Sequence, residues 1–170
     1  MDAESLRALQ APLKARYRGD ASAALITLKA KGALDEANIV CKVDTGRALV
    51  EAGLHPATGG AGSLVCSGDM LLEALVACAG VTVKAVATAL GIELRGGTVS
   101  AEGDLDFRGT LGVAKDAPVG FKSVRLRIEL DTDASEDQLA TLQKLTERYC
   151  VVYQTLVRGV PVEVTHQRRG

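Results

Sequence analysis

The longest apolar stretch of the chain, residues 67–91, reads SGDMLLEALVACAGVTVKAVATALG and carries only three charged side chains. Its length predicts one helix from about Asp69 to Leu90. Ser67 is the candidate N-cap, and Gly91 is the expected stop. A helix that is apolar on every side has to be covered on every side. We therefore expect a long central helix that is buried by the rest of the fold and by a second copy of the chain.

Strict alternation of apolar and polar residues predicts strands on either side of this helix. The clearest two cover residues 99–107 and 124–130. A hairpin is expected where residues 26–28 and 39–43 alternate across a short connection, and a last strand is expected over residues 160–165. Each of these strands has one polar face, which indicates a sheet with one side in contact with solvent.

The remaining segments read as helices or as loop. Leucines at helical spacing predict an amphipathic helix over residues 2–18, and residues 46–62 read as a loop because they are rich in glycine. Ser135 with Gln138 three residues later forms the pattern of a capping box. A short helix is expected over residues 150–159.

The predicted order is helix, hairpin, central helix, strands, two helices and strand. This order is typical of an α+β fold and lacks the regular alternation of a doubly wound sheet. A chain of 170 residues is long enough for one domain. We expect a helical extension at residues 1–19 and a single domain at residues 20–170.

The composition and charge of the chain argue against several classes of protein. Aromatic residues make up 3% of the chain, so the core has to be built from small aliphatic side chains. The net charge is −1 and no basic run stands out, which argues against binding of nucleic acid. The first residues lack the apolar segment of a secretory signal. The uncharged run between Glu73 and Lys84 is about half of the ~20 residues that span a bilayer, so we expect a cytoplasmic protein without a membrane segment.

Four cysteines are the candidate chemistry, and in the cytoplasm they are expected to stay reduced. They form no C-x-x-C pair, and the two histidines lie apart from them in the sequence. A zinc site is therefore not predicted, and we expect no metal or other cofactor. The residues concerned are Cys41, Cys66, Cys78, Cys150, His55 and His166.

Two of the thiols have distinctive surroundings. Cys78 lies among small residues in the middle of the central helix, where no end of that helix favours a thiolate. Cys150 lies at the start of a helix, where the positive end of the helix dipole is expected to stabilise its thiolate. Free cysteine also packs as a small hydrophobic residue, so core packing is an open alternative for all four cysteines.

The sequence resembles the OsmC/Ohr family of thiol peroxidases. The similarity rests on SGDMLLEALVACAGVTVKAVA at residues 67–87 and LTERYCVVYQTLVRGVPVEV at residues 145–164. The stretches HPATGGAGS (55–63) and GTLGVAKDAPVGF (109–121) are similar to one branch of the family. The similarity covers most of residues 20–166.

This resemblance implies an intertwined homodimer with curved antiparallel sheets around the central helices. It implies that Cys78 is the peroxidatic thiol and Cys150 the resolving thiol. The expected substrate is an organic hydroperoxide, and the expected reductant is a dithiol, either of the lipoyl type or a small thiol. No cofactor is implied.

The chain departs from the family pattern around the thiols. The family usually carries a Pro-Glu pair ahead of the first cysteine, whereas this chain has Ser67 and Gly68. The acid normally holds an arginine over the thiolate, and here the candidate cations are Arg47 and His55. Val151 stands where the family usually has proline. Two alternatives to the peroxidase therefore stay open, a non-catalytic protein that binds small molecules and a redox sensor that is oxidised stoichiometrically.

Overall fold

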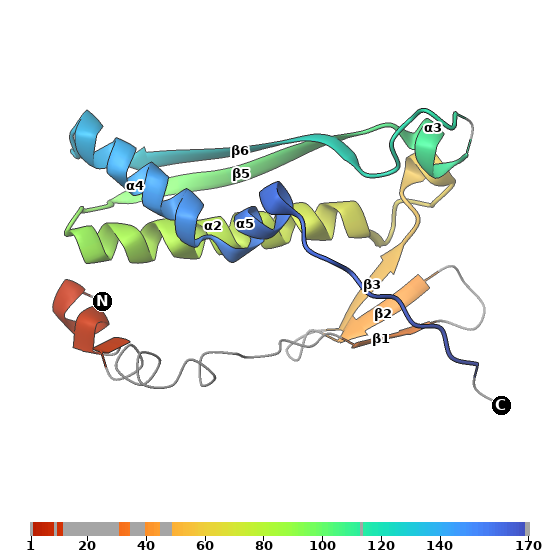
Figure 1. Cartoon of the computed structure of the whole chain (residues 1–170), viewed down its shortest axis with the longest axis horizontal. Coiled ribbons are helices and arrows are strands. Elements are labelled where there is room, and N and C mark those ends of the chain that lie inside the picture. The colour runs from red at the N-terminus through yellow and green to blue at the C-terminus, as the bar shows by residue number, and fades with distance from the viewer. Residues whose placement is uncertain are drawn as a thin grey trace.

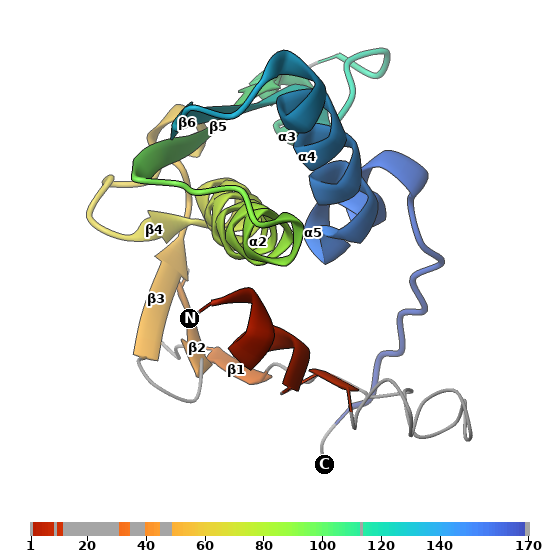
Figure 2. The same ribbon diagram turned by 90° about the vertical axis from the view of Figure 1, so that its left-hand side faces the viewer.

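The computed structural model describes residues 2–8, 10–11, 31–34, 40–44, 49–112 and 114–168. Its central element is α2 (Ser67–Leu90), which lies along a sheet of two long strands, β5 (Gly96–Leu105) and β6 (Phe121–Asp131) (Figure 1). Viewed along α2, this sheet covers one side of the helix, while α4 (Glu136–Tyr149) and α5 (Val151–Arg158) cover another (Figure 2). The described chain therefore has the predicted α+β architecture.

The helix α2 is buried along one stripe. Its buried residues are spaced four apart along the helix: Leu75, Ala79, Val83 and Ala87. By length and hydropathy alone α2 could cross a membrane, but a core helix of a soluble protein meets the same criterion. In the single chain other positions of α2 remain exposed, including Val81 at 72%. The expected burial of the whole circumference is therefore not reached by one copy of the chain.

The two ends of α2 differ in how well the sequence predicted them. Gly91 ends the helix with a φ of 71°, and its N–H donates to the carbonyls of Ala87 and Thr88, as predicted. The predicted N-cap was wrong. The N-cap is Cys66, because its pairing with Gly53 in the adjacent strand holds it extended and Ser67 already belongs to the helix.

The sheet of β5 and β6 is antiparallel and places its apolar residues toward the helices. Val99 pairs with Ile128, and Ala101 pairs with Leu126. The prediction of both strands is confirmed except at the end of the first one. There Phe107 begins a short helix, α3 (Phe107–Thr110), instead of extending the strand.

A second sheet has four strands in the order β1-β2-β3-β4. The strands are β1 (Lys31–Leu34), β2 (Val40–Asp44), β3 (Leu49–Gly53) and β4 (Val65–Cys66). The second strand of the predicted hairpin is confirmed, but its described partner is β1, which occupies the expected connection. Residues 26–28 lie outside the described residues. The predicted loop over residues 46–62 was wrong at residues 49–53, because β3 pairs along all five of its residues with β2; residues 54–62 contain only the short helix Pro56–Thr58.

The helices near the C-terminus confirm the prediction. The N–H of Gln138 donates to Ser135 Oγ (3.3 Å), and the N–H of Ser135 donates to Gln138 Oε1 (2.9 Å), which completes the capping box of α4. Helix α5 begins after Cys150 and ends before Gly159. Leu142 of α4 is buried in one core cluster with residues of α2, and this contact fixes α4 against the central helix.

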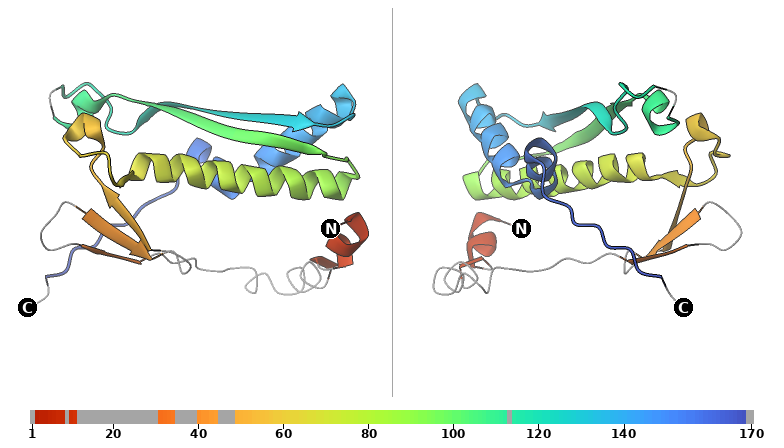
Figure 3. Two further views of the ribbon diagram at one scale, coloured as in Figure 1. Left: turned by 180° about the vertical axis from the view of Figure 1, so that it is seen from behind. Right: turned by 45° about the vertical axis from the view of Figure 1, so that its right-hand side comes forward.

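The helix predicted at the N-terminal end of the chain is described in part, and the strand predicted at the C-terminal end is absent from the described single chain. Residues 3–8 and 10–11 are helical, and the rest of the predicted helix over residues 2–18 lies largely outside the described residues. The predicted strand over residues 160–165 was wrong for the single chain. This segment leaves α5 as an extended chain (Figure 3), and no described strand pairs with it. Val162 in this segment is 79% exposed.

Candidate active site

Two cysteines come from different elements of the fold. Cys78 is half-buried in the middle of α2, between Ala77 on an exposed position and Ala79 on the buried stripe. Cys150 is 1% exposed and joins α4 to α5. Its N–H donates to the carbonyl of Thr146 (2.9 Å), and its carbonyl accepts from the N–H of Gln154 (2.9 Å). Cys150 is therefore held from both helices.

The fold brings these two thiols together. Helix α5 lies beside α2 in both views (Figures 1 and 2). The Cys150 thiol lies close enough to Cys78 for the two groups to shift each other's pKa. The backbone N–H groups of Val151 and Val152, in the first turn of α5, also act to lower the pKa of Cys78. Cys78 thus lies near a thiol and the N-terminal end of a helix.

These contacts affect the two thiols in opposite directions. Burial acts to raise the pKa of Cys78, but the N–H of Val152, the Cys150 thiol and the N–H of Val151 outweigh it. The pKa of Cys78 is therefore lowered from its ordinary value. Burial raises the pKa of Cys150, and the neighbouring Cys78 raises it further. This arrangement favours the thiolate on Cys78 over a thiolate on Cys150.

The structure corrects the sequence-based view of the helix dipole. Cys150 was expected to gain from the start of its own helix, and the N–H groups of Tyr153 and Val152 do act to lower its pKa, but burial outweighs them. Cys78 was expected to have no help from a helix end, yet the first turn of α5 also lowers its pKa. The hydroxyl of Thr82 also lies near, but it donates its single proton to the carbonyl of Cys78 (2.7 Å). We therefore assign Thr82 no part in holding the thiolate.

The other candidate residues lie elsewhere. His55 is the N-cap of the short helix Pro56–Thr58, where its Nδ1 accepts from the N–H of Ala57 (3.0 Å), and its ring stacks on Phe107 with centroids 4.8 Å apart. Among the described residues, the groups to which we attribute the lowered pKa of Cys78 belong to Val151, Val152 and Cys150, and His55 is not one of them. The idea that His55 supplies the cation is therefore not supported by its contacts.

Two further candidates remain without a described side chain. Arg47 lies outside the described residues, and of Cys41 the structure describes only the backbone of its strand.

Cys66 is free and caps the start of α2. It precedes Cys78 by twelve helical residues, which at ~1.5 Å per residue puts the two about 18 Å apart along the helix. Cys66 therefore belongs to a different region.

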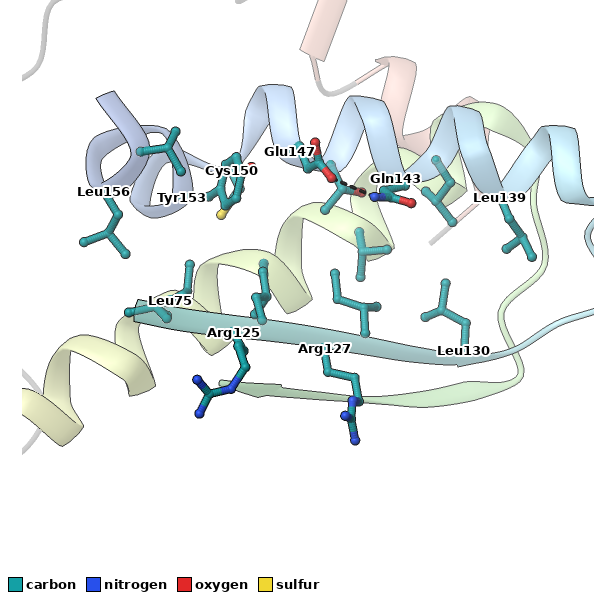
Figure 4. Close-up of a pocket in the computed structure, with 18 residues that line it drawn as sticks. Leu75, Arg125, Arg127, Leu130, Leu139, Gln143, Glu147, Cys150, Tyr153 and Leu156 are labelled. Carbon is teal, nitrogen blue, oxygen red and sulfur yellow. Dashed lines mark hydrogen bonds between the residues drawn. The ribbon is translucent and has the colours of Figure 1, made fainter. Parts of the chain in front are cut away.

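An apolar cavity lies behind Cys150. It has a volume of about 810 Å³ and is enclosed by α2, β6, α4 and α5. Figure 4 shows the sulfur of Cys150 pointing into it, and shows Arg125 and Arg127 pointing away on the far side of the sheet. Arg125 contacts Asp104 there and holds the pKa of that carboxyl well below its usual range. Both arginines thus belong to the outer face of the sheet.

One polar group at this cavity is unusual. The hydroxyl of Thr146 is buried and has no hydrogen-bond partner within the described part of the chain. Three other threonines in α2 and α4 donate to the carbonyl four residues earlier: Thr82, Thr88 and Thr141.

No group of three His, Cys, Asp or Glu side chains within the described ranges could hold a metal ion.

Exposed apolar positions flank Cys78 on its open side. Ala74 lies four residues before Cys78 and Val81 three residues after it, so both share its face of α2, and Ala77 borders that face. All three are exposed in the single chain. The arrangement presents a nucleophilic sulfur beside an apolar surface, with a second thiol within reach.

Comparison with known proteins finds a matching family model and similar folds. The family model described as OsmC-like protein matches residues 60–165. No curated protein matches the chain. The solved structure of an OsmC-like protein from Mycoplasma pneumoniae is similar with a TM-score of 0.66 and 16% identity, over 79% of this chain and 89% of that one. An organic hydroperoxide resistance protein OsmC from Legionella pneumophila has a TM-score of 0.60 and 20% identity, with 79% and 91% covered. The structure of an organic hydroperoxide resistance protein from Elizabethkingia anophelis, with thiocyanate bound, has a TM-score of 0.62 and 19% identity. The match covers 79% of this chain and 90% of that one.

Proposed function

This chain belongs to the family of OsmC-like proteins, and on that premise we propose that it is a thiol peroxidase that reduces organic hydroperoxides. Cys78 is the peroxidatic thiol and Cys150 the resolving thiol. The observation that carries the proposal is that the packing of α5 on α2 brings these two thiols, which are distant in the sequence, close enough to shift each other's pKa. The names of two structural relatives, organic hydroperoxide resistance proteins, support the substrate class.

The first step is attack by the Cys78 thiolate on the outer oxygen of the hydroperoxide. A sulfur–oxygen bond forms, the oxygen–oxygen bond breaks, and the alkoxide leaves and takes up a proton. The product on the enzyme is a sulfenic acid. The lowered pKa of Cys78 supports this role, because the thiolate is the nucleophile.

The second step joins the two sulfurs. The Cys150 sulfur attacks the sulfenic sulfur of Cys78, a disulfide forms, and the hydroxyl leaves as water with the thiol proton. An external dithiol then reduces the disulfide in two exchanges and is itself oxidised to a disulfide. The position of Cys150 beside Cys78 supports this step, because no large movement of the backbone is needed.

The surroundings favour an organic peroxide. Ala74 and Ala77 offer an apolar surface next to the sulfur, on which an alkyl or aryl group gains about 25 cal/mol for each Å² removed from water. Hydrogen peroxide has no apolar group and gains nothing from this surface. The described cysteines are free, which suits the reducing cytoplasm where we place the protein.

A second copy of the chain completes the fold in this proposal. The exposed side of α2 is apolar, and Val81 at its middle is 72% exposed. The C-terminal segment has valines exposed at positions 160, 162 and 164 and lacks a partner strand among the described residues. A homodimer in which the helices pack together and this segment adds to a sheet covers both surfaces.

The test is turnover of a dithiol that depends on an organic hydroperoxide. We expect Cys78→Ser to abolish peroxide-dependent oxidation of the dithiol. Cys66→Ser is the matched control, because Cys66 is also a free thiol on α2 but lies far from Cys150. It should keep the full rate. Equal rates in wild type and Cys78→Ser would remove the proposal.

The cavity behind Cys150 favours one other function, binding of a small apolar molecule without catalysis. Under this alternative the protein is purified with a ligand, and the double variant Cys78→Ser and Cys150→Ser retains it. The peroxidase predicts dithiol turnover, which a binding protein lacks. A redox sensor gives the disulfide once and then stops, so the number of turnovers per chain separates all three.

A further inference from the structure

Two helices meet at Cys150, which is both the C-cap of α4 and the N-cap of α5. The last carbonyl groups of an α-helix have no partner within that helix. At the end of α4, the carbonyl of Thr146 accepts from the N–H of Cys150 (2.9 Å). The next carbonyl, that of Glu147, accepts from the side-chain Nε2 of Gln154 (2.7 Å). A side chain of α5 therefore closes the end of α4.

Gln154 reaches back across the bend between the two helices. It lies in α5 and is half-buried. Its backbone N–H donates to the carbonyl of Cys150 (2.9 Å), and its side chain donates to Glu147, seven residues earlier in the chain. The second of these bonds links α5 to α4 without passing through Cys150. Its deletion leaves the backbone of one residue, with φ −72° and ψ 108°, as the link at the bend itself.

The direction of α5 matters for the pair of thiols. Helix α5 packs on α2, which carries Cys78. Cys150 is 1% exposed, so its sulfur is enclosed by the elements around it. A disulfide forms only within a narrow range of Cβ···Cβ distances, about 3.5–4.5 Å. A group that fixes the bend between α4 and α5 therefore controls how often the two thiols reach that geometry.

We propose that the side-chain amide of Gln154 is a positioning group that fixes the bend at Cys150 and holds this thiol within reach of Cys78. The inference rests on the proposed function for its purpose, because a fixed bend speeds the second step, in which the disulfide forms. Gln154 takes no part in the chemistry. It acts through Cys150, which it holds by one backbone bond directly and by one side-chain bond through the end of α4.

The residue types at this position allow the donor to be removed and restored. Glutamine, methionine and lysine have similar helix propensities, so exchanges among them leave α5 intact. Gln154→Met keeps a long side chain and deletes the donor. Gln154→Lys supplies a new donor, because lysine side chains also bond the last carbonyls of a helix. Gln143→Met is the matched control, since Gln143 donates to the Glu147 carboxylate (2.8 Å) within α4 and does not reach α5.

The first readout is the equilibrium of the thiol pair with glutathione. Glutathione disulfide takes two electrons and two protons from Cys78 and Cys150, which form a disulfide, and two glutathione thiols are released. Samples are quenched with acid, and the Cys78–Cys150 disulfide is quantified by peptide mass spectrometry. Loss of one hydrogen bond between neutral groups changes an equilibrium by about two- to ten-fold. Gln154→Met should lower the equilibrium constant by that factor, because the thiols are less well aligned before they react.

The two other variants show whether the effect belongs to the bend. Gln143→Met should keep the wild-type equilibrium constant, although it also loses a side-chain hydrogen bond of α4. Gln154→Lys should recover at least part of the loss. An unchanged constant in Gln154→Met overturns the inference. An equal fall in Gln143→Met also overturns it, and so does a constant in Gln154→Lys no higher than that of Gln154→Met.

The second readout separates the two steps of the proposed reaction. After one equivalent of cumene hydroperoxide, dimedone traps the sulfenic acid of Cys78 in competition with Cys150. Gln154→Met should give about two- to ten-fold more trapped Cys78 than wild type, with an unchanged rate of peroxide consumption. Equal trapping in both proteins refutes the inference alone. The predicted shift with glutathione, without any peroxide-dependent turnover in wild type, supports the inference and refutes only the peroxidase.

Discussion

The packing of α4 against α2 holds the thiol pair together, and Leu142→Ala tests it. Leu142 is 1% exposed and lies in a cluster with Val83, Ala87 and Ile92. Its helix ends at Cys150, whose N–H is bonded to the α4 carbonyl of Thr146. Loosening this contact therefore weakens both the core and the support of the resolving thiol.

The cost follows from burial and from the space that is left. Truncation removes three carbon atoms, which is about 2.4 kcal/mol of transfer free energy at ~0.8 kcal/mol for each. Leu142 already lines the cavity of about 810 Å³, so the new space adds to one that the neighbours do not fill. The cavity contribution raises the expected loss in the free energy of unfolding to about 3–4 kcal/mol. This corresponds to a fall in Tm of about 10 °C for a chain of this size.

Urea unfolding at one fixed protein concentration measures this change. The concentration is fixed because self-association stabilises the folded state by mass action. Leu111→Ala is the matched control, since Leu111 is 55% exposed and its truncation should change the free energy of unfolding by less than about 0.5 kcal/mol. A loss below about 1 kcal/mol in Leu142→Ala would refute the packing of α4 on α2.

Two further predictions concern the thiols and the open face of α2. Cys150→Ala should raise the pKa of Cys78, because it removes a thiol that lowers this pKa, whereas Cys150→Ser keeps a donor and should raise it less. In wild type the pH profile of Cys78 alkylation should have a midpoint below that of an ordinary thiol. Equal midpoints in wild type and both variants would contradict this prediction. Val81→Glu should turn the dimer into a monomer in light scattering, because it places a charge on the apolar face of α2; an unchanged mass for this variant would show that this face is not the interface.

The pattern of the sequence predicted the local elements well. The alternating strands β5 and β6, the capping box of α4 and the glycine stop of α2 depend on neighbouring residues alone, and all were confirmed. The errors arose where pairing with distant strands decides the structure. Strand β3 has no clear alternation, and its pairing with β2 makes it a strand. The segment after Gly159 has alternation but no described partner strand, so it forms none in the single chain.

The site was predictable in its residue types and not in its geometry. Cys78 and Cys150 were singled out by their surroundings and by resemblance. No local signal indicates that the start of α5 faces Cys78, because backbone N–H groups are present in every sequence. Only the packing of α5 on α2 shows that the start of this helix lowers the pKa of Cys78. The division into an extension at residues 1–19 and a domain at residues 20–170 stays a prediction.

The most direct measurement is a peptide map of the reduced protein after one equivalent of cumene hydroperoxide. We predict a single new disulfide that joins Cys78 to Cys150 within one chain, so that the oxidised protein keeps the mass of a single chain on a non-reducing gel. A disulfide between two chains, a pairing with Cys66, or an unmodified Cys78 would contradict the account.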